Sequence, residues 1–197
     1  MTQPNFDSEA LNLLIEPDNR ETRSKWRTLV QEPLFKPVYN VSLDYSRDLA
    51  YARLKKISEA KIMSIFDFEK NPKRIFAGHE MCGFIDGSLA TKMTVQWNLF
   101  GGTTHTFHTD HHREVLEGID SMKYVGCFCL TELGFGNNAV KMETTATWDQ
   151  ATQEFIINCP TIRSQKYWIT NGACHAHYSV VFCQTIIAGK NEGINIF

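Results

Sequence analysis

Apolar residues recur at a helical period over the first 120 residues of the chain. Across residues 42–64 they recur at roughly a helical period, at Tyr45, Leu49, Leu54, Ile57 and Ile62, with lysines and arginines between them, which is typical of an amphipathic helix. Ser8 is a candidate N-cap for the first helix, which Pro17 ends. The same reasoning predicts helices over 8–16, 18–32, 42–64, 73–86, 86–102 and 110–120, with Gly101-Gly102 as a stop or a point of close packing.

After Lys123 the pattern changes to short runs rich in β-branched and aromatic residues, which are typical of strands. The polar segment 149–153 suits the connection of an antiparallel hairpin. The last residues, 191–197, read as the start of one more strand. The predicted strands cover 125–132, 142–149, 154–161, 165–170 and 178–189.

Helices followed by strands predict an α+β fold. We expect an N-terminal all-helical domain over residues 1–122 and an antiparallel, barrel-like β-domain over residues 123–197. Because the final strand stops on its most apolar residues, we expect this β-domain to be incomplete without further structure or a partner chain.

The bulk composition is that of a globular protein: 197 residues, 43% of them hydrophobic, with a net charge of −2. This charge gives no electrostatic footprint for nucleic acid, and no apolar run is long enough to cross a bilayer. The N-terminus lacks a signal-peptide core and an acid-poor transit sequence. We therefore expect an intracellular protein with no nucleic-acid partner and no membrane span.

The cysteines and histidines suggest no metal site. The six cysteines lie mostly in apolar strand-like runs and predict reduced, buried thiols. Cys127-x-Cys129 places two thiols on one strand face, which is not a zinc-knuckle spacing. Four histidines have a spacing that can ligate a metal on a helix, but we favour solvated or capping roles for His105, His108, His111 and His112. The basic segment 53–56 is most simply a solvated helix face.

Two segments stand out as candidates for chemistry. In "GCFCLTELGFGNN" (126–138) an apolar strand opens into a Gly-rich polar loop that starts with Thr131 and Glu132. Such a loop offers backbone N–H groups, a hydroxyl and room for a flat or phosphorylated ligand. In "QKYWITNG" (165–172) aromatic residues flank a polar corner, and together they could pack against a planar heterocycle. Taken singly, each segment is more simply a core strand and its turn.

Together, and in this order, these segments resemble the acyl-CoA oxidases, within the acyl-CoA dehydrogenase/oxidase flavoprotein superfamily. The resemblance covers most of the chain from about residue 70. "TELG" rather than "TEPG" favours the oxidase branch, whereas "WITNG" is more like the dehydrogenase motif. The segments that carry the resemblance are "WNLFGG" (97–102), "GID" (118–120) before "YVGCFCLTELGFGNN" (124–138), "ETTATWDQATQEFIINCPT" (143–161) and "KYWITNG" (166–172).

The resemblance implies a fold, a reaction and a site. The chain would hold the N-terminal helical domain and most of the middle β-domain, without the family's C-terminal helical bundle. The reaction would be FAD-dependent desaturation of a fatty acyl-CoA to a trans-2-enoyl-CoA in β-oxidation, with electrons passing to O₂ to give peroxide. Flavin contacts would come from Thr131, Gly134, Gly136, Trp168, Ile169 and Thr170, and substrate contacts from Phe135, Asn137 and Asn138.

This sequence also departs from the family pattern. Gly136-Asn137-Asn138 replaces the usual Gly-Ser-Asn, and Phe135 replaces the usual histidine. The family's catalytic glutamate would lie beyond Phe197, so no residue here is assigned as the base, and Glu132 is a poor substitute. We expect little turnover by this chain alone and a need for a C-terminal helical domain or partner chain, with a homodimer or larger complex left open.

Two other interpretations stay open at this point. The chain could be a truncated, non-catalytic relic that serves as a structural or assembly subunit of a larger complex, which the altered loop favours and the retained Thr131 and Trp168 oppose. It could also be a dehydrogenase that passes electrons to another flavoprotein. Family analogy indicates the peroxisome, with mitochondrial or other compartments not excluded.

Overall fold

The computed structural model describes residues 5–197, which divide into two compact units. The first unit holds the chain up to Met93 together with Asp120–Met122, and the second holds Thr94–Ile119 and Lys123–Phe197. The division does not follow the change from helices to strands, because the helical residues from Thr94 onward group with the strands. The domain boundary at residue 122 stays a prediction.

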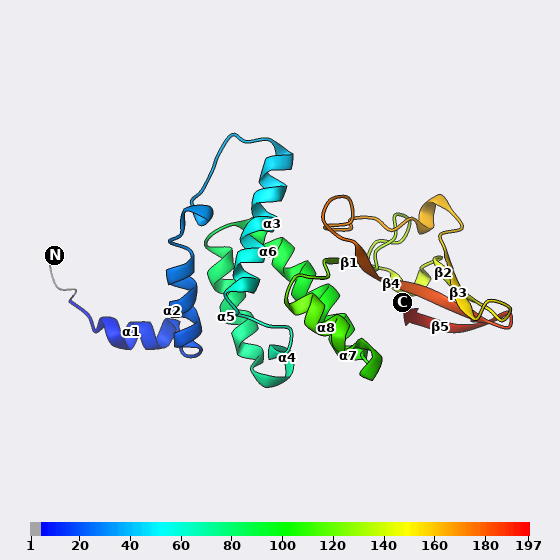
Figure 1. The fold of residues 1–197 in the computed structure, drawn as a ribbon, viewed down its shortest axis with the longest axis horizontal. Coiled ribbons are helices and arrows are strands. Elements are labelled where there is room, and N and C mark those ends of the chain that lie inside the picture. Colours follow the sequence, from blue (N-terminus) through cyan, green and yellow to red (C-terminus); the bar gives the residue numbers. More distant parts are fainter. Residues whose placement is uncertain (1–4) are drawn as a thin grey trace. The chain divides into compact units, whose positions relative to one another are not determined.

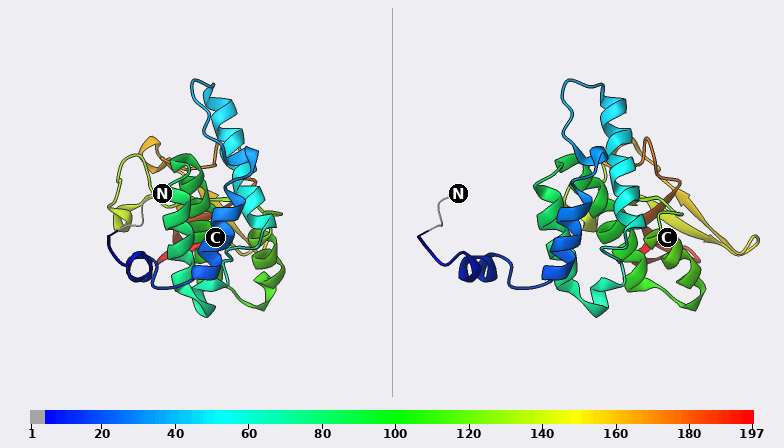
Figure 2. Two further views of the ribbon diagram at one scale, coloured as in Figure 1. Left: turned by 90° about the vertical axis from the view of Figure 1, so that its left-hand side faces the viewer. Right: turned by 60° about the vertical axis from the view of Figure 1, so that its left-hand side comes forward.

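The first unit is helical, and its core is built by the apolar stripes that the sequence pattern predicts. In this unit α3 packs with α6, and α5 packs with α2, α4 and α6 (Figures 1 and 2). Trp26, Leu54 and Ile57 are almost fully buried. Its elements are α1 (Ser8–Ile15), α2 (Arg20–Leu29), η1 (Pro33–Phe35), α3 (Leu43–Glu59), α4 (Asp67–Lys70), α5 (Pro72–Gly83) and α6 (Gly87–Met93).

The basic segment 53–56 is not wholly solvated, contrary to expectation. Arg53 is only 4% exposed. Its guanidinium lies 2.6 Å from the Asp86 carboxylate and donates to the carbonyls of Leu34 (2.9 Å) and Lys36 (2.7 Å). A charge buried with an opposite charge and satisfied N–H groups can be part of a helix core, and sequence pattern alone does not reveal such partners. The first helix also begins differently, since Asp7 rather than Ser8 is its N-cap.

The second unit opens with the helical elements η2 (Thr94–Gly101), α7 (Gly102–Phe107), η3 (Asp110–His112) and α8 (Arg113–Asp120), of which only the last residue, Asp120, groups with the first unit. The π-helix η2 continues into α7, so Gly101-Gly102 is not a stop. The φ of Gly101 is −65°, an ordinary helical value. Fully buried Gln96 fastens η2 to β1 (Gly126–Cys129): its amide donates to the carbonyls of Ile119 (3.1 Å) and Tyr124 (2.8 Å) and accepts from the Gly126 N–H (3.0 Å).

The strands form one curled sheet in the order β1-β4-β2-β3, with β5 also paired to β4 (Figure 1). Besides β1 they are β2 (Thr145–Asp149), β3 (Glu154–Asn158), β4 (Tyr178–Ile187) and β5 (Lys190–Ile196). The α+β class is thus confirmed. The sheet is mixed rather than antiparallel, because β1 and β2 both run parallel to β4. Long connections carry the chain back before β4, and this permits parallel pairing.

Two hairpins of the sheet follow from local sequence. The polar segment 149–153 connects β2 to β3 as predicted, with Asp149 opposite Glu154. The final strand is also confirmed, as β5. Ala188 and Gly189, both with positive φ (48° and 78°), form its two-residue turn from β4. Positive φ at both turn positions matches the natural twist of a hairpin.

All six thiols are free, but Cys159 and Cys174 are exposed rather than buried. Within residues 5–197 no group of three or more His, Cys, Asp or Glu side chains is arranged to hold a metal ion. None of the helices in that range is long and apolar enough to span a membrane.

Candidate functional site

The two segments that the sequence singles out lie against each other in the second unit. The Thr131 carbonyl accepts a hydrogen bond from the Tyr167 N–H (2.9 Å), and Glu132 forms a β-bridge with Lys166. The loop after β1 is held further by Leu133 N–H to the Gln165 carbonyl (2.9 Å). Backbone pairing therefore joins the Gly-rich loop to the aromatic corner across more than thirty residues of sequence.

Two glycines allow the loop to take this path. A Cβ on Gly134 would lie 2.6 Å from the Cβ of Arg163, too close for any side chain, and the Gly134 N–H donates to the Arg163 carbonyl (2.8 Å). Gly136 has a φ of +52° where the loop turns back. The glycines thus serve the close approach of backbone to backbone and a left-handed turn.

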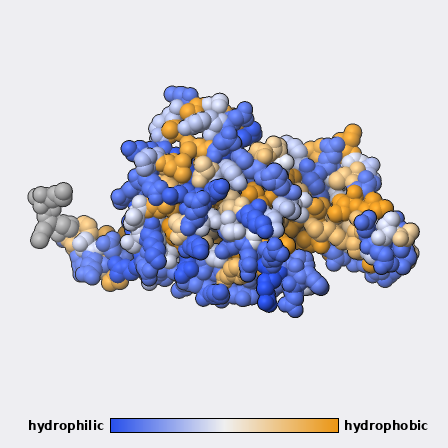
Figure 3. Space-filling view, viewed as in Figure 1, coloured by the Kyte–Doolittle hydropathy of each residue, from blue (hydrophilic) through white to orange (hydrophobic). Residues whose placement is uncertain are grey.

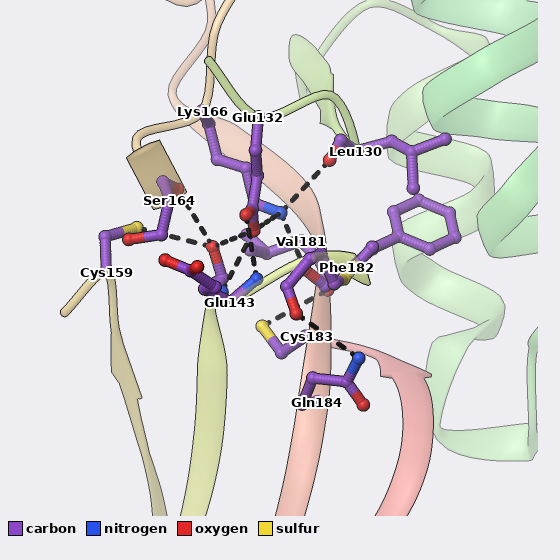
Figure 4. A network of polar contacts seen from close by, with 12 residues as sticks. Leu130, Glu132, Glu143, Cys159, Ser164, Lys166, Val181, Phe182, Cys183 and Gln184 are labelled. Atoms are coloured by element: carbon purple, nitrogen blue, oxygen red, sulfur yellow. Dashed lines mark hydrogen bonds and ion pairs between the residues drawn. The ribbon is translucent and has the colours of Figure 1, made fainter. Parts of the chain in front are cut away.

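A buried carboxylate, Glu132, is the centre of the polar network that Figure 4 shows. Its side chain is 1% exposed and accepts from the N–H groups of Glu143 (2.8 Å) and Thr144 (3.0 Å). The Thr144 hydroxyl donates to the same carboxylate at 2.5 Å and lies 3.1 Å from the Ser164 carbonyl. The carboxylate thereby ties together the loop after β1, the residues before β2 and the segment before the corner.

Lys166 supplies the countercharge. Its ammonium donates to Glu132 Oε1 (3.1 Å) and to the carbonyls of Leu130 (3.1 Å) and Phe182 (2.9 Å), and its side chain is 11% exposed. Burial raises the pKa of Glu132, but hydrogen bonds from the Thr144 hydroxyl, the Glu143 and Thr144 N–H groups and Lys166 outweigh this and hold the pKa below its usual value. An ionised, fully engaged carboxylate is a structural clamp and a poor proton acceptor, in agreement with the sequence-based view of Glu132.

The aromatic corner is not the strand that the sequence predicts over 165–170. Only Lys166 takes part in a bridge, and Trp168 has a φ of +64°. A non-glycine residue in this region interrupts the extended backbone. The indole of Trp168 is left 83% exposed. Asn171, with a φ of +70°, then closes a tight turn in which its carbonyl accepts from the N–H groups of Cys174, His175 and Ala176.

The remaining predicted site residues lie on the open side of the loop and corner. Gly134, Gly136, Asn137 and Asn138 are exposed, whereas Thr131, Phe135, Ile169 and Thr170 are partly exposed. Within residues 5–197 the Thr131 hydroxyl forms no hydrogen bond, so it is available to a ligand. The Arg163 guanidinium lies over the Phe135 ring, 4.7 Å from its centroid. Their roles toward flavin and substrate stay predictions.

Thr144 and Ser164 belong to the site's supporting network but were not singled out from the sequence. Thr144 is fully buried, and so is Ser164. Their residue types give no strong signal, because a buried hydroxyl and a solvated one look alike in sequence. The position of Thr144 inside the "ETTAT" segment, next to a strand, is the one indication that was available.

A largely apolar cavity of about 450 Å³ lies beside the start of β1 and β4. Aromatic rings from helices and strands of the second unit line much of it, among them those of Phe100, Phe107, Tyr124, Tyr178 and Phe197. Thr103, Thr104, His112 and Ser179 add a few polar groups. Sequence reasoning does not find this cavity, because its walls come from distant segments. Figure 3 shows apolar residues also at the surface of the unit that contains the strands.

The relatives found by comparison with known proteins agree with the motifs. The chain is 33% identical over 197 residues to the peroxisomal acyl-coenzyme A oxidase 3 of Homo sapiens, a match that covers 98% of this chain and 28% of the human protein. Its structure is similar to acyl-CoA oxidase 3 from Yarrowia lipolytica, with a TM-score of 0.83 and 27% identity over 98% of this chain and 28% of that one.

A second solved structure shares the fold. It is acyl-CoA oxidase-1 from Caenorhabditis elegans complexed with FAD and ATP, with a TM-score of 0.77 and 22% identity over 98% of this chain and 30% of that one. No family model matches the chain. The chain spans less than a third of the length of these relatives. Similarity over nearly all of its own length, in sequence and in fold, shows that this chain belongs to the acyl-CoA oxidase family and corresponds to part of a full-length member.

Proposed function

We propose that this chain provides the flavin-facing and acyl-CoA-facing part of an acyl-CoA oxidase that desaturates fatty acyl-CoA in β-oxidation. The observation that carries the proposal is the pairing of the loop 131–138 with the corner 165–172 through Thr131–Tyr167 and Glu132–Lys166. The two segments that resemble the family's flavin-binding motifs are therefore one surface, held by a buried ion pair.

The residues of this surface fit FAD. A planar ring system needs an apolar face and hydrogen-bond donors at its edge. Trp168 is 83% exposed, and the Thr131 hydroxyl forms no hydrogen bond within residues 5–197. Gly134, Gly136, Ile169 and Thr170 would complete the contact. When bound, the flavin supplies the hydride-accepting and oxygen-reactive chemistry, and the protein supplies position and electrostatics. The relative from Caenorhabditis elegans was solved with FAD.

For the substrate, we assign Phe135, Asn137 and Asn138 to the outer side of the loop. An apolar cavity of about 450 Å³ in the same unit has the size and character that suit a hydrocarbon chain. Because Glu132 is engaged by four donors, the base that removes the α-proton comes from outside this network. We assign that base to a C-terminal helical domain or a partner chain, and by analogy with peroxisomal relatives we place the protein in the peroxisome.

Titration of the purified chain with FAD tests this proposal. We expect flavin fluorescence to be quenched on binding, with affinity lowered several-fold in Thr131→Val and Trp168→Ala. Phe84→Ala is the matched control, since Phe84 is an equally exposed aromatic (89%) in the other unit, and it should bind like the wild type. Circular dichroism would show that each variant is folded.

The same titration bears on the structural-subunit alternative. A folded chain that takes up no FAD at any concentration tested would overturn flavin binding by this chain. Equal affinity in all three variants would overturn the assigned surface. Bleaching of bound flavin by a long-chain acyl-CoA under anaerobic conditions would show that a base is supplied.

A further inference from the structure

Two thiols on one face of β1 lie within contact distance. Cys127 Sγ and Cys129 Sγ are 3.7 Å apart, because residues two positions apart on a strand point to the same side. β1 pairs with β4 in parallel, with Cys127 opposite Ser179 and Cys129 opposite Val181. The strand ends at Cys129, and the loop begins two residues later, at Thr131.

The two thiols differ in surroundings. Cys127 is 5% exposed, and its sulfur is 3.6 Å from the Tyr178 carbonyl. Cys129, by contrast, is partly exposed. The two sulfurs are in hydrogen-bond contact, and against the effect of burial this contact, the Ser179 hydroxyl and the Lys166 ammonium hold the pKa of Cys129 below its ordinary value. The same contact, with burial, raises the pKa of Cys127.

The other buried thiols of the chain provide a contrast. Burial raises the pKa of Cys82 to about 12 and that of Cys183 to about 11. Thiolates rather than thiols are the nucleophiles in reactions with peroxides. Of the four buried or partly buried cysteines in residues 5–197, Cys129 is thus the one whose neighbours favour the reactive form.

We propose that Cys129 and Cys127 form a peroxide-oxidisable dithiol, in which Cys129 is attacked first and Cys127 resolves it. The Cys129 thiolate displaces hydroxide from hydrogen peroxide, so that its sulfur gains an S–OH bond as the O–O bond breaks. The Cys127 sulfur then attacks the sulfenic sulfur, releases its proton, and expels the oxygen as water. Two thiols and one peroxide give one disulfide and two waters.

Disulfide formation moves side chains at the end of β1. The two sulfurs must close from 3.7 Å to about 2.05 Å. Because β1 ends at Cys129, directly before Leu130 and Thr131, oxidation acts next to the start of the loop that carries the proposed flavin contacts.

Thiol mapping after limited oxidation of the whole 197-residue chain tests the inference. The reduced chain is treated with stoichiometric hydrogen peroxide, blocked with iodoacetamide and digested. We expect the peptide with Cys127 and Cys129 to lose two hydrogens before the exposed Cys159 and Cys174 react, and to recover on reduction with dithiothreitol. The readout needs neither FAD nor acyl-CoA, so its failure leaves the proposed function standing.

Two serine variants separate the roles of the thiols. In Cys127→Ser, Cys129 should accumulate as a sulfenic acid that dimedone traps. In Cys129→Ser, Cys127 should be oxidised several-fold more slowly than the pair is in the wild type. Three results would each overturn the proposal. The first is faster oxidation of Cys159 or Cys174 than of this pair. The second is an oxidation rate of Cys127 in Cys129→Ser equal to that of Cys129 in Cys127→Ser, and the third is a sulfinic acid on Cys129 with Cys127 still free.

Discussion

At the scale of single residues, Glu132 decides how the loop after β1 is held. Its carboxylate accepts from two backbone N–H groups, one hydroxyl and one ammonium while 1% exposed. The sequence places Glu132 in a motif and indicates that it is a poor base. It does not identify the partners Thr144 and Lys166 as such, since they stand 12 and 34 positions away. Long-range polar pairing has no local signature, which is why the network could not be predicted.

Glu132→Gln should lower the free energy of unfolding by about 3 kcal/mol, because it leaves the buried Lys166 ammonium without its charged partner. Urea unfolding at pH 7 measures the change. The control is Glu192→Gln, which removes the exposed ion pair with Lys190 and should cost less than about 1 kcal/mol. Equal losses of unfolding free energy in the two variants would show that the buried ion pair does not stabilise the fold more than the exposed one.

The ionisation of Glu132 should contribute to the pH dependence of the unfolding free energy. Its pKa is lower in the folded chain than its unfolded value near 4.5, so its contribution is present above that value and is lost as the pH falls through the folded pKa. The stability difference between wild type and Glu132→Gln should therefore shrink below about pH 4.5. Urea unfolding in steps from pH 7 to pH 3.5 gives the two curves, and parallel curves would contradict the assignment.

At the scale of elements, local pattern accounts for most helices and strands but not for all their limits. The β2–β3 hairpin and the last strand follow from alternation and turn residues. The pattern is wrong at 165–170, where Trp168 takes a positive φ, and the helix does not stop at Gly101-Gly102 but continues. In both places tertiary packing overrides local preference: the corner pairs with the loop after β1, and η2 is fixed to β1 by Gln96.

The contact between β1 and η2 gives a test at this scale. A Cβ on Gly126 would lie 2.3 Å from the ring of Phe100, which is itself only 4% exposed, so Gly126→Ala should destabilise the chain by about 2 kcal/mol through overpacking. Gly83→Ala, at the end of α5 with nothing near its Cβ, should be neutral or slightly stabilising. Thermal unfolding compares them. A Gly126→Ala variant as stable as the wild type would argue against this packing.

At the scale of the whole molecule, the family and the α+β class could be read from the sequence, whereas the topology could not. Nothing in the strands themselves predicts that β1 and β2 both run parallel to β4, or that aromatic rings from helices and strands line a cavity of about 450 Å³. Both depend on how distant segments return to each other. The same holds for the loop 131–138 and the corner 165–172, which we propose form one flavin-facing surface.

Hydrogen–deuterium exchange of the purified chain with and without saturating FAD tests that claim most directly. The account predicts that amide protection rises together in peptides covering 131–138 and 165–172, which Thr131–Tyr167 and Glu132–Lys166 join. Peptides from α3 should not change. Protection of only one of the two segments, or protection centred elsewhere in the chain, would contradict a single flavin-facing surface.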